Sequence, residues 1–145
     1  MEIRNKSAYF EYHIEDKFDA GLVLQGTEVK SLREGKASFN DSYCYFNNGE
    51  LWIKSLYIAE YSHGTFNNHD PVRERKLLLS KRELKKLDGK VKEKGFSIVP
   101  LRIFFNEKGL AKMEIGFGKG KKLHDKRETI KLRETDREIK RKYGL

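Results

Sequence analysis

The chain has 145 residues, a length typical of one domain, and hydrophobic and charged residues each make up 37% of it. No apolar run approaches the roughly 18 residues that cross a bilayer, which excludes a membrane-spanning protein. The 31 Lys and Arg against 22 Asp and Glu give a net charge of +9, which favours a polyanionic partner. The single cysteine, Cys44, excludes an internal disulfide. A buried structural thiol in a cytoplasmic protein is therefore expected.

The first third of the chain predicts two strands and a helix. Apolar and polar residues alternate over 8–14, the period of a half-buried strand. Residues 19–26 read as a second short strand bracketed by glycines. Thr27 is expected to cap a short helix that runs to Glu34 and is closed by Gly35.

The middle of the chain predicts three further strands. Aromatic and branched residues favour strands over 39–46 and 51–58, joined by a tight hairpin at 47–50. The Gly- and Asn-rich stretch 61–70 is typical of a loop, and 75–79 is a strand candidate that turns from basic to apolar.

The last elements are a helix and a hairpin. Ser80 and Glu83 have the spacing of a capping box, so a helix is expected to start there. Residues 96–105 and 110–117 predict a final hairpin, in which Pro100 indicates an edge strand or a bulge.

Several short antiparallel strands with inserted helices predict a mainly β protein built as a small β-barrel. The oligonucleotide-binding fold is the natural candidate, because small barrels remove exposed edge strands and can carry RNA on one face. We expect a barrel domain over 1–117 and a basic C-terminal tail over 118–145, where the composition changes.

The tail is the most charged part of the chain. From Lys119 to Leu145 there are 11 Lys and Arg and 5 Asp and Glu, so two thirds of the net charge lie in this segment. It has too few apolar residues to bury, and it is rich in helix formers. We expect it to be disordered when free and helical when bound to a polyanion. The glycines of the Gly118–Lys122 entry would let the backbone approach phosphate closely.

The sequence offers no pattern for catalysis or for a cofactor. The four histidines and Cys44 have no metal-ligand spacing, and no phosphate-binding glycine loop is present. The pairs His69-Asp70 and His124-Asp125 lack a nearby nucleophile that would complete a triad. We therefore expect no enzyme activity, no metal and no cofactor.

A second basic region surrounds the predicted helix over 27–34. Lys30 and Arg33 are three residues apart and share one helix face. Glu28 among these cations is either a surface ion pair or an acceptor for a base edge or a ribose hydroxyl.

Three stretches together resemble a known family. They are Asp19–Arg33 (DAGLVLQGTEVKSLR), Asp70–Leu79 (DPVRERKLLL) and Gly118–Arg127 (GKGKKLHDKR). In this order they are similar to the SsrA-binding proteins, small protein B, of bacterial trans-translation, and the resemblance spans essentially the whole chain.

This resemblance implies a monomeric RNA-binding adaptor with two partners, transfer-messenger RNA and the ribosome, and no membrane partner. The barrel would grip the tRNA-like end of the RNA in place of a missing anticodon stem. The tail would probe the decoding site and the empty mRNA channel of a stalled ribosome. A structural ribosomal protein and a nucleic-acid enzyme are the rival classes.

The resemblance also implies which residues act. Those matching RNA-binding positions are Asn5, Asp19, Ala20, Gly21, Glu28, Lys30, Ser31, Arg33, Arg75, Lys76 and Leu78. Those matching the decoding-site tail are Lys119, Gly120, Lys121, Lys122, His124, Asp125, Lys126 and Arg127. The family more often has Glu at the position of Asp19.

Overall fold

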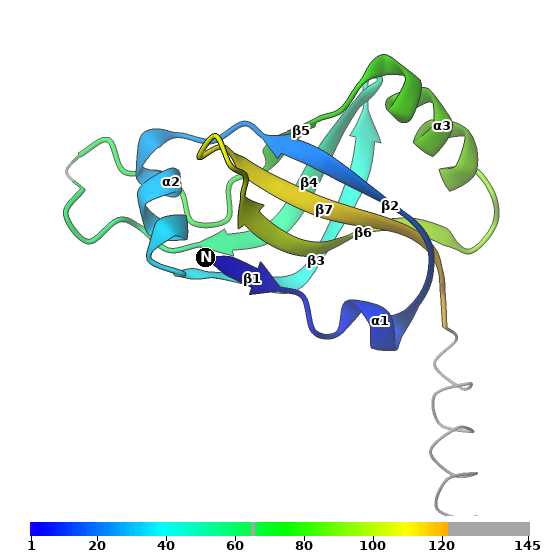
Figure 1. The fold of residues 1–145 in the computed structure, drawn as a ribbon, viewed down its shortest axis with the longest axis horizontal. Coiled ribbons are helices and arrows are strands. Elements are labelled where there is room, and N and C mark those ends of the chain that lie inside the picture. Colours follow the sequence, from blue (N-terminus) through cyan, green and yellow to red (C-terminus); the bar gives the residue numbers. More distant parts are fainter. Residues whose placement is uncertain (65, 122–145) are drawn as a thin grey trace, which may run out of the picture.

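The computed structural model describes residues 1–64 and 66–121. Its centre is a barrel of six antiparallel strands, in the order β6-β3-β4-β5-β2-β7, which closes because β6 also pairs with β7 (Figure 1). The six are β2 (Tyr12–Leu22), β3 (Ala37–Asn47), β4 (Glu50–Ile58), β5 (Arg75–Leu78), β6 (Phe96–Phe105) and β7 (Ala111–Gly120). A short strand, β1 (Glu2–Arg4), adds to β6. The mainly β, barrel prediction is confirmed.

Three helices accompany the barrel: α1 (Ala8–Glu11), α2 (Gly26–Arg33) and α3 (Lys81–Val91). In Figure 1, α2 and α3 lie at opposite ends of the barrel. Leu32 of α2 and Leu87 of α3 are fully buried in the same apolar core as Ile53, Ile103 and Ile115 from the strands. Helices α2 and α3 therefore contribute side chains to the core of the barrel.

The structure corrects the predicted start of the chain. Residues 8–11 form a helical turn, in which Phe10 N and Glu11 N donate to Ser7 O at 3.1 and 2.9 Å. One strand, β2, then runs unbroken from Tyr12 to Leu22. The helical turn buries Ala8 against Val99 and Leu101, so burial of this residue does not require the strand that the alternation over 8–14 predicted.

Other predicted elements are confirmed with their turn chemistry. The 47–50 hairpin holds Asn48 and Gly49 at φ of 52° and 76°, the left-handed values of a two-residue turn. Ser80 and Glu83 form the capping box of α3. The Pro100 bulge is present, since the β6–β7 register shifts between Pro100 and Arg102.

Strand β7 ends at Gly120, three residues beyond its predicted end. Gly118 pairs with Ile14 on one side and Ser97 on the other. A Cβ at position 118 would overlap the His13 carbonyl oxygen, so the close approach that this glycine permits is to β2. The boundary expected at residue 118 therefore falls inside a paired strand.

Candidate RNA-binding surface

The predicted RNA-binding residues separate into a buried set and an exposed set. Ala20, Glu28, Ser31 and Arg75 are fully buried, whereas Asp19, Lys30, Arg33 and Leu78 are exposed. Gly21 is buried beneath Leu78, and Asn5 and Lys76 are half-buried. The buried set fixes the position of α2, and α2 carries two residues of the exposed set, Lys30 and Arg33.

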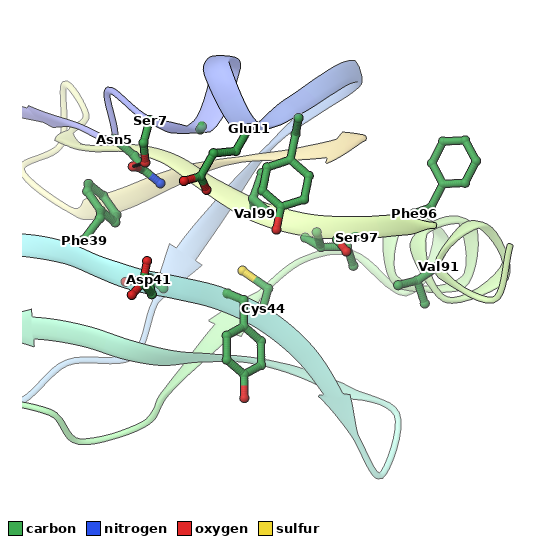
Figure 2. Close-up of a pocket in the computed structure, with 15 residues that line it drawn as sticks. Asn5, Ser7, Glu11, Phe39, Asp41, Cys44, Val91, Phe96, Ser97 and Val99 are labelled. Carbon is green, nitrogen blue, oxygen red and sulfur yellow. Dashed lines mark hydrogen bonds between the residues drawn. The ribbon is translucent and has the colours of Figure 1, made fainter. Parts of the chain in front are cut away.

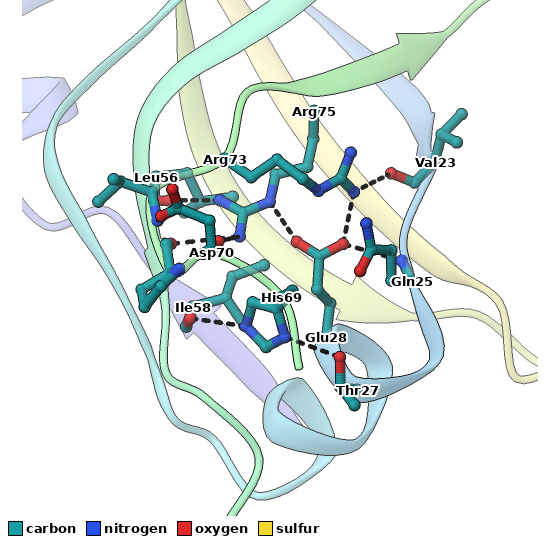
Figure 3. Close-up of polar contacts among 12 residues, drawn as sticks. Val23, Gln25, Thr27, Glu28, Leu56, Ile58, His69, Asp70, Arg73 and Arg75 are labelled. Atoms are coloured by element: carbon teal, nitrogen blue, oxygen red, sulfur yellow. Dashed lines mark hydrogen bonds and ion pairs between the residues drawn. The ribbon is translucent and has the colours of Figure 1, made fainter. Parts of the chain in front are cut away.

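Glu28 is the centre of a sealed polar cluster (Figure 3). One carboxylate oxygen accepts from Arg73 Nη2 at 2.5 Å and from Gln25 N at 2.8 Å, and the other accepts from Arg75 Nε at 2.5 Å. Arg75 also donates to the carbonyl of Leu56. We call Glu28, Arg73 and Arg75 the Glu28 cluster; it ties the first turn of α2 to β4 and to the start of β5.

Burial by itself would raise the pKa of Glu28, but the hydrogen bonds from Arg73, the Gln25 backbone and Arg75 outweigh it and lower that pKa. Burial lowers the pKa of Arg75 although Glu28 opposes the change. Because a guanidinium starts far above neutrality, Arg75 stays charged. Of the two readings of Glu28, the ion pair describes this structure, although the pair lies in the interior.

A second buried link holds the other side of α2. His69 is 3% exposed; its Nε2 lies 2.9 Å from Ile58 O and its Nδ1 lies 2.8 Å from Thr27 Oγ1. A carbonyl can only accept, so Nε2 donates, and in the neutral ring Nδ1 accepts from the Thr27 hydroxyl. The cap assigned to Thr27 was wrong, since α2 begins at Gly26 and Glu28 accepts from the Gln25 N–H. No feature of the sequence singled out His69 as this link.

The exposed set comes from α2, β2 and β5: Lys30 and Arg33 belong to α2, Asp19 to β2 and Leu78 to β5. Gly21 and Leu78 are directly opposite in the β2–β5 ladder, and Leu78 is 50% exposed. Beside them is an apolar hollow of about 360 Å³ that extends to Val29 and to Leu110 of the β6–β7 hairpin. On α2, the cations of Lys30 and Arg33 lie 5.3 Å from the Tyr61 ring and 5.6 Å from the Phe105 ring, respectively.

Of three further predicted residues, Asn5 and Lys76 have side-chain partners within the protein, whereas the Ser31 hydroxyl has none among residues 1–64 and 66–121. The Asn5 side chain donates to Pro100 O at 2.8 Å and so fastens the N-terminal segment to the β6 bulge. Lys76 Nζ pairs with Glu50 at 2.7 Å. Ser31 Oγ is buried and finds no hydrogen-bond partner in the described part of the chain.

The tail residues are only partly described. Lys119 is exposed and, with Gly120, completes β7, while Lys121 N donates to Glu11 O at 2.9 Å. Lys122, His124, Asp125, Lys126 and Arg127 lie outside the described residues, so their assigned role stays a prediction.

A separate hollow opens where β3 and β6 diverge, because these strands share only the Cys44–Ile98 pair (Figure 2). Cys44 lines it from β3, and burial raises the pKa of its thiol, as expected of a structural cysteine. Glu11 and Asp41 also line this hollow. Among residues 1–64 and 66–121, no group of three or more His, Cys, Asp and Glu could hold a metal ion.

None of the described helices combines the length and the apolarity needed to cross a bilayer.

Comparison with known proteins shows the family of the chain. The family model described as SmpB protein matches residues 2–144. An SsrA-binding protein of Phocaeicola vulgatus is 54% identical over 143 residues, which are 99% of this chain and 95% of the relative. One from Thermosipho africanus is 53% identical over 135 residues, covering 93% and 91%.

A solved structure, "tmRNA-SmpB: a journey to the center of the bacterial ribosome", contains a similar chain. The TM-score is 0.73 at 48% identity, over 89% of this chain and 94% of that chain. The chain belongs to the SmpB protein family.

Proposed function

We propose that this protein binds transfer-messenger RNA and delivers it to stalled ribosomes for trans-translation, as a cytoplasmic monomer that acts by binding and not by catalysis. The similar relatives are SsrA-binding proteins, and a similar chain occurs in a structure of tmRNA with SmpB on the bacterial ribosome. The barrel would act as an oligonucleotide-binding fold, an assignment supported by its small size and its antiparallel strands.

The observation that carries the proposal is the combination of the exposed side chains of Leu78, Lys30 and Arg33 with the apolar hollow that Gly21 and Leu78 line. The cations attract phosphate, and the hollow offers an apolar contact beside them. The Glu28 cluster and His69 hold α2 against the barrel and so fix where Lys30 and Arg33 project. In this proposal Glu28, Ser31 and Arg75 position the surface, Gly21 leaves room for Leu78, and Asp19, Lys30, Arg33 and Leu78 contact the RNA.

The test is binding of the full chain to the labelled tRNA-like domain of transfer-messenger RNA. The double variant Lys30→Gln/Arg33→Gln should bind more weakly. The slope of log K against log salt should also become shallower, by up to about 1.8 if both side chains contact duplex phosphates. Lys54→Gln, which removes an exposed cation from β4, serves as the control. If the double variant bound as the wild type does, the surface would be misplaced.

The proposed role of the C-terminal segment needs a second test. Because β7 pairs through Gly120 and Lys121 N bonds to Glu11 O, a truncation that spares the barrel must begin after Lys121. Removing residues 122–145 should leave RNA binding largely intact and abolish peptide tagging on stalled ribosomes. Loss of RNA binding in this truncation would contradict the division between a barrel that holds RNA and a tail that probes the decoding site.

A further inference from the structure

A hollow of about 640 Å³ lies beside β1, between α1 and the outer faces of β2, β6 and β7. Four cations line it: Arg4, Lys6, Lys17 and Arg102. Two carboxylates, Glu2 and Glu114, and the exposed side chain of Tyr9 also line it, together with Leu101 and with Asn5, one of the predicted RNA-binding residues. We call it the Tyr9 hollow. Its size lies within the range of small-molecule sites, and none of the motifs that indicated RNA binding includes its cations.

The carboxylates of the Tyr9 hollow are already occupied by its arginines. Glu2 accepts from Arg4 Nε at 2.9 Å and lies 3.6 Å from Arg102 Nη1, while Glu114 lies 3.4 Å from Arg102 Nη2. The positive charge left over is that of Lys6 and Lys17. Neither lysine forms an ion pair within the described ranges, so their charge is available to an incoming anion.

Tyr9 gives the hollow an aromatic wall on a fixed backbone. Its side chain is 51% exposed, although the neighbouring Ala8 is buried against Val99 and Leu101 and anchors the α1 turn. Lys17 Nζ lies 5.3 Å from the centre of the Tyr9 ring, and hydrogen bonding to Tyr9 raises the lysine pKa. Exposed aromatic rings next to free cations are how proteins hold unstacked bases and their phosphates.

The Tyr9 hollow adjoins the proposed RNA-binding surface. Lys17 and Asp19 point to the same side of β2 because successive side chains alternate along a strand. Glu114 is the cross-strand partner of Asp19 in the β2–β7 ladder. An RNA lying along Asp19 and Gly21 would therefore reach this hollow without leaving the sheet.

We propose that the Tyr9 hollow receives one unstacked nucleotide of transfer-messenger RNA, with its base against Tyr9 and its phosphate between Lys6 and Lys17. The inference rests on the proposed function and adds a site to it. Arg102, paired with both carboxylates and 4.2 Å from the centre of the Phe104 ring, shapes the wall and keeps Glu2 and Glu114 from repelling the phosphate.

The experiment measures binding of full-length variants to the labelled tRNA-like domain. Tyr9→Leu should weaken binding about 5- to 150-fold, the range for loss of one base stack, whereas Tyr9→Phe keeps the ring and should bind as the wild type does. Tyr57→Leu removes another exposed tyrosine, from β4 outside the hollow, and should change nothing. Thermal melts of all three variants establish that the fold is intact.

A second measurement addresses the phosphate. Lys6→Gln/Lys17→Gln should reduce the slope of log K against log salt by about 0.7, the value for one phosphate on a single strand. Unchanged affinity in Tyr9→Leu together with an unchanged slope in the lysine variant overturns the proposal. So does a loss confined to ribosome binding, which would assign the hollow to ribosomal RNA.

The two hypotheses fail differently. If the wild type did not bind the tRNA-like domain, the proposed function would fall. If Lys30→Gln/Arg33→Gln weakened binding and Tyr9→Leu did not, only the nucleotide site would be lost.

Discussion

The Glu28 cluster and the Tyr9 hollow both contain paired Glu and Arg side chains, but the Glu28–Arg75 pair of the cluster is buried and the pairs of the hollow are partly exposed. In the cluster, Glu28 and Arg75 are fully buried, and their charges are satisfied inside the protein. In the hollow, Arg102 and Glu114 keep 31% and 18% of their side chains exposed, and two lysines remain unpaired. The ion pairs of the Glu28 cluster fix the position of α2, whereas the lysines of the Tyr9 hollow are available to bind a ligand.

The largest expected effect comes from opening the sealed cluster. Arg75→Met should lower the free energy of unfolding by about 3–5 kcal/mol, because it leaves the Glu28 carboxylate buried with one arginine only. Urea unfolding followed by circular dichroism measures the loss. The matched control is Arg102→Met in the hollow, where the ion pairs stay partly open to water and the loss should be smaller. If both variants lost the same free energy of unfolding, the buried and the partly exposed ion pairs would not differ in their contribution to stability.

Glu28 should contribute to the decrease in the free energy of unfolding at acidic pH. Its pKa is lowered in the folded state, so its contribution is complete above the ordinary carboxyl pKa of about 4.3 and is lost as the pH falls through the lower folded value. The stability difference between the wild type and Glu28→Gln should therefore shrink on going from pH 7 to pH 3. A difference that stayed constant over this range would contradict the assignment.

His69 should have a smaller effect than the ion pair. His69→Ala leaves the Thr27 hydroxyl and the Ile58 carbonyl without their partner, which should cost about 1–3 kcal/mol of stability. Unfolding midpoints measure the cost. The exposed His63, in the same loop, is the control, and its replacement by Ala should stay within about 0.5 kcal/mol.

The smallest effect on stability should come from the exposed set. Lys30→Gln/Arg33→Gln should change the free energy of unfolding by no more than about 0.5 kcal/mol, because both side chains are exposed, while RNA affinity falls. Parallel melts and binding titrations separate the two quantities. If the variant lost both stability and RNA affinity, Lys30 and Arg33 would have to be counted among the residues that stabilise the fold.

The sequence alone determined the barrel, the 47–50 turn and the capping box at Ser80, and it narrowed Pro100 to an edge strand or a bulge. Each of these depends on residues that are close in the chain: a period of two, a pair of residues suited to positive φ, a hydroxyl three residues before a carboxylate. Motifs in register also indicated the family before any contact was known.

The tertiary structure alone decided which charged residues face water. Glu28 and Lys30 are two positions apart and equally polar, yet one is sealed by Arg73 and Arg75, which lie more than forty positions away. The same holds for Tyr9, Lys17 and Arg102, which come together only when β2 and β6 close the barrel around β7. A local pattern records what a residue can do, whereas burial and partners depend on contacts between segments distant in the chain.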